Sequence, residues 1–91
     1  MKIERIITVF DKKTDRLKEE ISIDYVDLIK LKKIFKPSTD DPLMYMVYEI
    51  TEGLIPQICE LLGDKVVFDL QNYQYYVECV QLPPYDFGVK D

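Results

Sequence analysis

The run Asp40–Ile50 constrains the fold more than any other part of this sequence. Leucine, methionine, tyrosine, valine and isoleucine follow one another in it almost without interruption, which is typical of a β-strand. The run lies near the middle of a 91-residue chain, a length that supports one domain with a single modest core. We therefore expect residues 43–50 to form a strand within one sheet.

The first 23 residues predict a β-hairpin. Residues 2–10 are rich in β-branched side chains, and residues 11–15 form a polar turn. Residues 16–23 alternate between two faces, as a half-buried antiparallel strand does. The inward set is Leu17, Ile21 and Ile23, with Glu19 interrupting it, and the outward set is Lys18, Glu20 and Ser22.

Two helices are predicted between the strands. Asp24 can cap the first, which should run from about 25 to 36 and stop before Pro37. The second follows Thr51 and ends at Gly63, a natural residue after a helix C-terminus. Pro56 marks its first regular turn and makes residues 51–54 less regular.

The remaining segments complete the expected fold. Residues 66–70 and 73–80 read as strands joined by a tight turn at Gln71 and Asn72. The order is thus ββαβαββ, an α+β fold with a mostly antiparallel sheet and both helices on one face. Residues 1–91 form one domain, and residues 83–91 form a C-terminal tail that either packs on the body or stays loose.

Charge is distributed unevenly along the chain. Residues 1–36 hold 10 of the 12 Lys and Arg residues, whereas residues 37–91 hold 10 of the 17 acids and six of the seven tyrosines. An acidic, tyrosine-rich half repels nucleic acid and suits a basic protein partner. The alternative is a solvated surface that keeps a small protein soluble.

Residue types exclude most catalytic chemistry. The chain has no histidine, and therefore no Ser/His or Cys/His nucleophile pair. Two cysteines, Cys59 and Cys79, and three glycines form neither a zinc site nor a phosphate-binding loop. Adjacent acids at Asp40 and Asp41 are more typical of a turn than of a cation site. We expect no enzyme activity, cofactor or metal, no membrane segment or signal peptide, and a cytoplasmic location.

The sheet face without helices is the predicted binding surface. Strand alternation places Tyr45, Val47 and Glu49 outward, and Met44, Met46, Tyr48 and Ile50 inward. The outward residues of the last two strands are Val67, Asp69, Gln74, Tyr76, Glu78 and Val80. Tyrosine is enriched at interface hot spots, although it also has high β propensity on an ordinary solvated face.

The pattern also resembles a known group of proteins. The opening hairpin, the run Asp40–Ile50, the helix end Leu61–Gly63 and the strand Tyr75–Cys79 resemble short bacterial domains of unknown function. Some of these are immunity proteins of contact-dependent growth inhibition and related polymorphic toxin systems. The resemblance implies a cytosolic protein that binds and blocks the toxin domain of its own locus, commonly a nuclease.

The leading hypothesis is therefore a non-enzymatic inhibitor that covers the basic cleft of a toxic nuclease. Its expected contact residues are Asp40, Asp41, Tyr45, Glu49, Asp69, Tyr76 and Glu78. One alternative is a self-assembling or interaction module unrelated to toxins, in which the exposed sheet face pairs with its own copy. The other is an enzyme with Cys79 or Cys59 as nucleophile.

Overall fold

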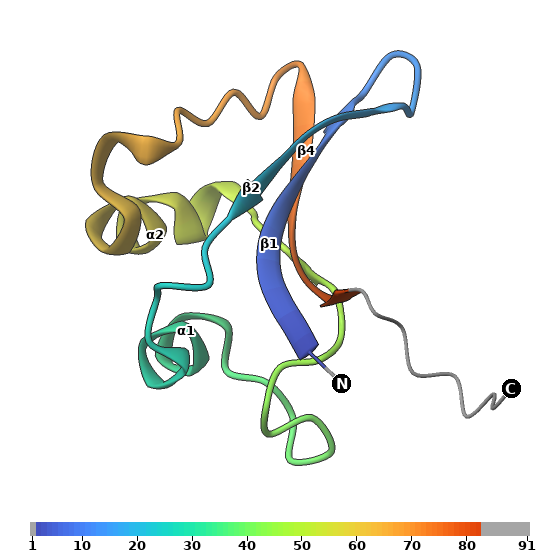
Figure 1. The fold of residues 1–91 in the computed structure, drawn as a ribbon. Helices are drawn as coiled ribbons and strands as arrows, with labels where there is room; N and C mark the ends of the chain where they lie inside the picture. Colours follow the sequence, from blue (N-terminus) through green and yellow to red (C-terminus); the bar gives the residue numbers. More distant parts are fainter. Residues whose placement is uncertain (1, 83–91) are drawn as a thin grey trace, which may run out of the picture.

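A four-stranded antiparallel sheet carries two helices on one of its faces (Figure 1). The computed structural model describes residues 2–82. In chain order the elements are β1 (Lys2–Asp11), β2 (Leu17–Ser22), α1 (Leu28–Phe35), β3 (Tyr48–Glu49), α2 (Ile55–Leu62) and β4 (Tyr73–Leu82). The strand order across the sheet is β2-β1-β4-β3, with every neighbouring pair antiparallel. The expected α+β class, with both helices on one face, is confirmed.

The first and last strands form the centre of the sheet. β1 and β4 pair along ten residues each, from Lys2 opposite Leu82 to Asp11 opposite Tyr73. Ile7 and Val9 of β1 and their partners Val77 and Tyr75 are buried on the helix side. Because neighbouring side chains on a strand alternate, this pairing also fixes which residues lie on the other face.

The core lies between this central pair and the helices. It joins the buried residues of β1 and β4 to Leu31 of α1 and to Ile58 and Leu62 of α2. The segment after α2 also reaches the core, because Phe68 packs against Tyr75 with ring centroids 4.8 Å apart. One buried layer thus holds the sheet, both helices and the chain leading into β4.

Helix α1 begins later than the sequence predicts. Its N-cap is Asp27, whose carboxylate accepts the backbone N–H of Ile29 at 2.9 Å. Asp24, the predicted cap, instead accepts the backbone N–H of Arg5 at 3.2 Å. The helix ends as predicted before Pro37, where Lys36 takes a left-handed conformation.

Helix α2 matches the prediction from Pro56 and Gly63. Residues Glu52–Leu54 form a short 3₁₀ turn, and regular α-helix begins at Ile55 with Pro56 in its first turn. Gly63 follows the last helical residue with φ +66°, a value at which a side chain would be strained. The local residue chemistry therefore sets both ends of this helix.

The predicted strand at 66–70 is wrong. Both edges of β4 near Tyr75 are already paired, with Val9 of β1 on one side and Ile50 on the other. Residues 66–70 cross the helix side of the sheet instead. The Tyr75 hydroxyl holds them there, since it accepts the backbone N–H of Asp69 at 2.9 Å and donates to the carbonyl of Val67 at 3.4 Å.

Only the last part of the predicted strand 43–50 pairs with the sheet. Tyr48 and Glu49 pair with β4, but Tyr45 and Met46 donate their backbone N–H groups to the carboxylate of Asp41. Those N–H groups cannot also bond to β4, so the chain leaves the sheet before Tyr48. The prediction that Met46 points inward is consequently wrong, because its side chain is 64% exposed.

A register shift alters the start of β2. It falls opposite Val9 and Phe10 of β1 and pairs Leu17 with Phe10. Leu17, predicted inward, is therefore 49% exposed, and Lys18 lies over the ring of Tyr73 at 4.3 Å from its centroid. The predicted tail at 83–91 lies outside the described residues. No helix in residues 2–82 combines the length and hydropathy that crossing a membrane requires.

Candidate functional site

The sheet face opposite the helices carries a row of side chains that spans all four strands. Strand pairing places Glu20 of β2, Thr8 of β1, Tyr76 of β4 and Glu49 of β3 side by side. Strands lie about 4.8 Å apart, so the two glutamates stand about 14 Å from each other with the tyrosine between them. A carboxylate thus closes each end of the row.

Neighbouring residues extend this row into a surface, which we call the acidic face. It comprises Glu4, Ile6, Thr8, Phe10, Glu20, Glu49, Tyr76 and Glu78. Ile6 and Thr8 are buried at its floor, whereas Glu20 and Glu49 are exposed. The surface therefore combines a small apolar and hydroxyl floor with carboxylates around it.

Specific contacts hold the aromatic and acidic groups in place. The Thr8 hydroxyl donates to the carboxylate of Glu78 at 2.6 Å, across the β1–β4 pair. Phe10 and Tyr76 meet edge to face, with ring centroids 5.9 Å apart. Both contacts join the two central strands and hold Glu78 and Tyr76 in place on this face.

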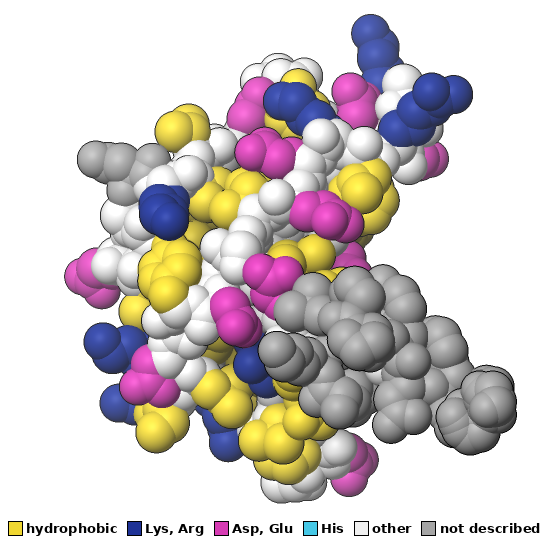
Figure 2. All heavy atoms as spheres, in the orientation of Figure 1, with side chains coloured by type: hydrophobic (Ala, Val, Ile, Leu, Met, Phe, Trp, Pro, Cys, Tyr) yellow, Lys and Arg dark blue, Asp and Glu magenta, His cyan; other side chains and the backbone are white. Residues whose placement is uncertain are grey.

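Two cations, Arg5 of β1 and Lys18 of β2, lie away from this face. Both are on the helix side, where Arg5 donates to the carbonyl of Leu43 and Lys18 contacts Tyr73. Figure 2 shows acidic side chains along the strands, with Lys and Arg gathered at the β1–β2 turn and over the helical side. Arg5 and Lys18 thus lie on the opposite side of the sheet from the four glutamates, and a cluster of carboxylates attracts a basic surface.

Three of the predicted contact residues come together on the acidic face. Glu49 pairs directly with Tyr76, and Glu78 is the next residue on the same side of β4. The alternation of the strand at 73–80 was read correctly, and so was the outward direction of Glu49. These three residues form the part of the candidate site that sequence reasoning found.

Asp41 has an internal role instead of facing a partner. It is only 5% exposed, and it accepts the Tyr48 hydroxyl together with the backbone N–H groups of Tyr45 and Met46. The Tyr48 hydrogen bond, aided by those of the two backbone groups, lowers the pKa of Asp41. The same bond raises the pKa of Tyr48 to about 12. The expectation that Asp41 contacts a partner is therefore corrected.

The other predicted contact residues lie away from the acidic face. Asp69 belongs to the segment on the helix side, as does Val67, which was predicted to lie on the open face. The Asp69 carboxylate accepts the side-chain amide of Asn72 at 2.9 Å. That hydrogen bond lowers the pKa of Asp69. Tyr45 lines a small hollow beside the end of β4, and Asp40 is exposed on the loop next to Asp41.

Sequence reasoning missed Glu4, Glu20 and Phe10 as members of the face. The alternation of residues 16–23 already placed Glu20 outward, but the contact set was drawn from the acidic second half of the chain. The pairing of β1 with both β2 and β4 brings the acids of the first half onto the same face. That long-range pairing has no signal in the local pattern.

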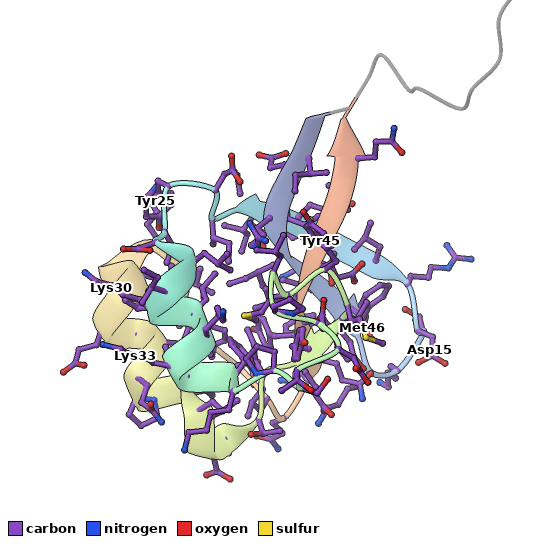
Figure 3. All side chains as sticks on the ribbon, turned by 90° about the horizontal axis from the view of Figure 1, so that it is seen from below. Asp15, Tyr25, Lys30, Lys33, Tyr45 and Met46 are labelled. Atoms are coloured by element: carbon purple, nitrogen blue, oxygen red, sulfur yellow. The ribbon has the colours of Figure 1, made fainter. Side chains whose placement is uncertain are left out.

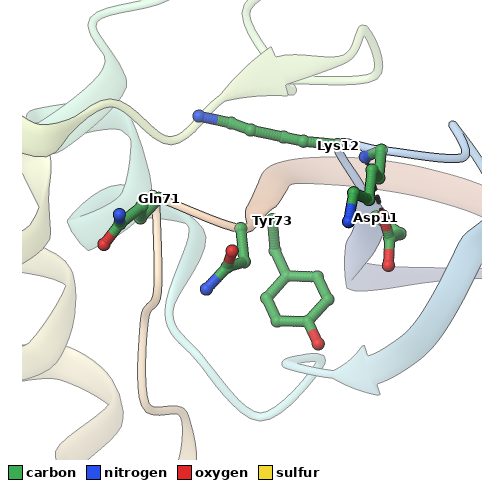
Figure 4. Close-up of a pocket in the computed structure, with 6 residues that line it drawn as sticks. Asp11, Lys12, Gln71 and Tyr73 are labelled. Carbon is green, nitrogen blue, oxygen red and sulfur yellow. Dashed lines mark hydrogen bonds between the residues drawn. The ribbon is translucent and has the colours of Figure 1, made fainter.

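Another hollow lies away from the acidic face. It has a volume of about 350 Å³ and lies between the β1–β2 turn and the start of β4, lined by Asp11, Lys12, Gln71 and Tyr73 among others (Figure 4). Lys12 is engaged there with the carbonyl of Leu70. Within residues 2–82 no three His, Cys, Asp or Glu side chains gather as metal ligands. Burial raises the pKa of Cys79, which weakens it as a nucleophile.

Comparison with known protein families gives one match. Residues 4–78 fit a family described as a domain of unknown function, DUF7683. The chain belongs to this family. The matched region begins in β1 and ends in β4, so it includes both helices and every residue of the acidic face. No curated protein matches the sequence.

Proposed function

We propose that this protein is an immunity protein, a non-enzymatic inhibitor that binds a basic toxin domain through its acidic face. The toxin is of the nuclease class, and the complex forms in the cytoplasm of the cell that makes the inhibitor. A nuclease needs a basic cleft to hold a phosphate backbone. Carboxylates on a rigid sheet can take the place of those phosphates and block the cleft.

The observation that carries the proposal is the row Glu20–Thr8–Tyr76–Glu49, with Glu78 beside it. Its acids come from three strands, and the neighbouring cations Arg5 and Lys18 point to the other side. Tyr76 supplies a large, partly apolar contact at the centre of the row, as interface hot spots do. We expect the glutamates to speed association and the tyrosine to slow dissociation.

The test measures binding to the toxin domain encoded beside the gene. Charge reversal at Glu49 and Glu78 (Glu49→Lys with Glu78→Lys) should slow association at least about tenfold at low salt, and the loss should shrink as salt rises. Tyr76→Ala should mainly raise the dissociation rate, with a loss of about 2 kcal/mol in binding free energy. Stopped-flow or surface-plasmon measurements separate the two rates.

A matched control separates local from overall charge. Glu60→Lys changes net charge in the same sense but lies exposed on α2, on the other side of the sheet. The double variant Glu19→Lys with Glu60→Lys matches the charge change of the Glu49 and Glu78 pair, and both of its sites are exposed on the helix side. Absence of any complex, or equal slowing by the control and face variants, would rule out the acidic face as the inhibitory surface.

Self-assembly through the same face is less favourable. Two copies that met face to face would bring Glu4, Glu20, Glu49 and Glu78 against the same four carboxylates. Like charges placed together across an interface cost several kcal/mol. The acidic face therefore suits a basic partner better than another copy of itself.

A further inference from the structure

One edge of the sheet is unpaired near the end of β4. The Tyr75 carbonyl accepts from Ile50, so the backbone groups of odd-numbered β4 residues point away from β1. β3 covers this edge only opposite Tyr76 and Val77. Among the described residues, the N–H and C=O groups of Cys79 and Gln81 have no strand beside them.

Exposed apolar side chains gather next to this edge. Leu43, Tyr45, Met46 and Val47 are between 45% and 64% exposed, and they make up half of the large exposed hydrophobic side chains in the described part of the chain. Tyr45 lines a hollow of about 150 Å³ with Cys79, Val80 and Gln81. Figure 3 shows Tyr45 and Met46 on this loop, away from Lys30 and Lys33 on the outer side of α1. We call residues 43–47 and 79–81 the apolar edge.

The apolar edge contains no charged residue, in a chain that is 32% charged with a net charge of -5. Two acidic molecules repel each other wherever their acids meet, so a neutral strip is where two copies approach most easily.

We propose that two copies of this chain pair through the apolar edge, with β4 antiparallel to β4 about a two-fold axis at Val80. Cys79 of one copy then pairs with Gln81 of the other, and the reverse, which gives four backbone hydrogen bonds. The two apolar loops meet on either side of the axis. This pairing would join the two sheets edge to edge, so the acidic faces of the two copies would lie side by side, with Glu4 next to Val80 in each. The dimer is tested with this chain alone and does not rest on the proposed toxin.

A cross-link at the axis tests this geometry. Val80 would oppose its own copy in a non-hydrogen-bonded pair, where Cα atoms lie about 4.5 Å apart and a disulfide can form. Val80→Cys, in a background of Cys59→Ser and Cys79→Ser, should give a disulfide-linked dimer under mild oxidation. Gln74→Cys, on the same strand and face, would lie about 40 Å from its copy and should stay monomeric on a non-reducing gel.

A second experiment measures the dimer in the native chain. Sedimentation should give a mass that rises with concentration towards that of a dimer. Val47→Lys should weaken association at least about tenfold, because it places a charge on the contact. Val67→Lys is the matched control, since Val67 is 85% exposed but lies on the helix side.

Three results would overturn the proposal. They are a monomer mass at every concentration, cross-linking of the Gln74→Cys variant in place of the Val80→Cys variant, and equal weakening by the two lysine variants. The first would mean that copies of this chain do not pair through the edge. The second would mean that copies meet through their faces.

Discussion

The two edges of the sheet are built in opposite ways. β2 is an outer strand of six residues with charged side chains at Lys18, Glu19 and Glu20. On the β4 side, a strand of two residues covers part of the edge, and an apolar loop without a charge lies beside the rest. Charged side chains on an outer strand discourage pairing with another chain, and their absence invites it.

The difference shows that one edge is protected by its own charged side chains, whereas the other is left partly unpaired beside a loop. On the β4 side, Asp41 draws the N–H groups of Tyr45 and Met46 away from the sheet. A single carboxylate, that of Asp41, therefore decides how far β3 extends. This gives the molecule one inert edge and one edge that depends on a local hydrogen-bond network.

The largest effect is expected from removing that carboxylate. Asp41→Ala should lower the melting temperature and speed amide exchange at Tyr45 and Met46 at least about tenfold, because those groups lose their acceptor. Asp40→Ala is the control, since Asp40 is its exposed neighbour. Unchanged exchange in Asp41→Ala would show that the loop does not depend on this residue.

The second effect concerns the inert edge. Replacing Lys18 with Thr and Glu19 with Val removes one positive and one negative side chain from β2 and leaves the net charge unchanged. The edge then resembles the apolar edge, and we expect concentration-dependent association that light scattering can follow. A variant that stays as monodisperse as the parent would show that charge is not what protects β2.

The third effect is a loss of folding stability at high pH. The hydrogen bond to Asp41 raises the pKa of Tyr48 from 10.0 to about 12, so folding favours the neutral phenol. The resulting stability is fully present below pH 10 and is lost as pH rises through about 12. The stability difference between the native chain and Tyr48→Phe, from urea unfolding, should therefore narrow over that range. A constant difference would contradict the assigned bond.

The smallest effect is expected at the centre of the sheet, between the two edges. Thr8→Val keeps the shape but leaves the Glu78 carboxylate without the Thr8 hydroxyl. The cost in unfolding free energy should be about 1 kcal/mol, measured by urea titration. A loss as large as that of Asp41→Ala would mean that the centre, and not the edge network, limits stability.

The sequence was sufficient to predict the elements whose ends or faces are set by neighbouring residues. Pro56 and Gly63 set the ends of α2, and the alternation of residues 73–80 placed Tyr76 and Glu78 on one face. The predicted strand 43–50 failed over residues 43–47, and the predicted strand 66–70 failed throughout, for a different reason. Their β propensity is high, but one is held by Asp41 and the other is excluded because both edges of β4 are taken.

The candidate site divides in the same way. Glu49, Tyr76 and Glu78 followed from alternation within single strands. Glu4 and Glu20 join them only because β1 pairs with β2 on one side and with β4 on the other. Asp41 was misassigned because an acid that caps a loop and an acid that meets a partner have the same local sequence.

The central pairing of β1 with β4 has a consequence for how the chain is made. Lys2 pairs with Leu82, so the β1–β4 pairing cannot be completed until nearly all of the described chain has been synthesised. Contacts this distant in sequence slow folding, because the intervening chain must be ordered first. Until β4 pairs with it, one edge of β1 stays open, and unpaired edges with apolar side chains are where folding chains associate with one another.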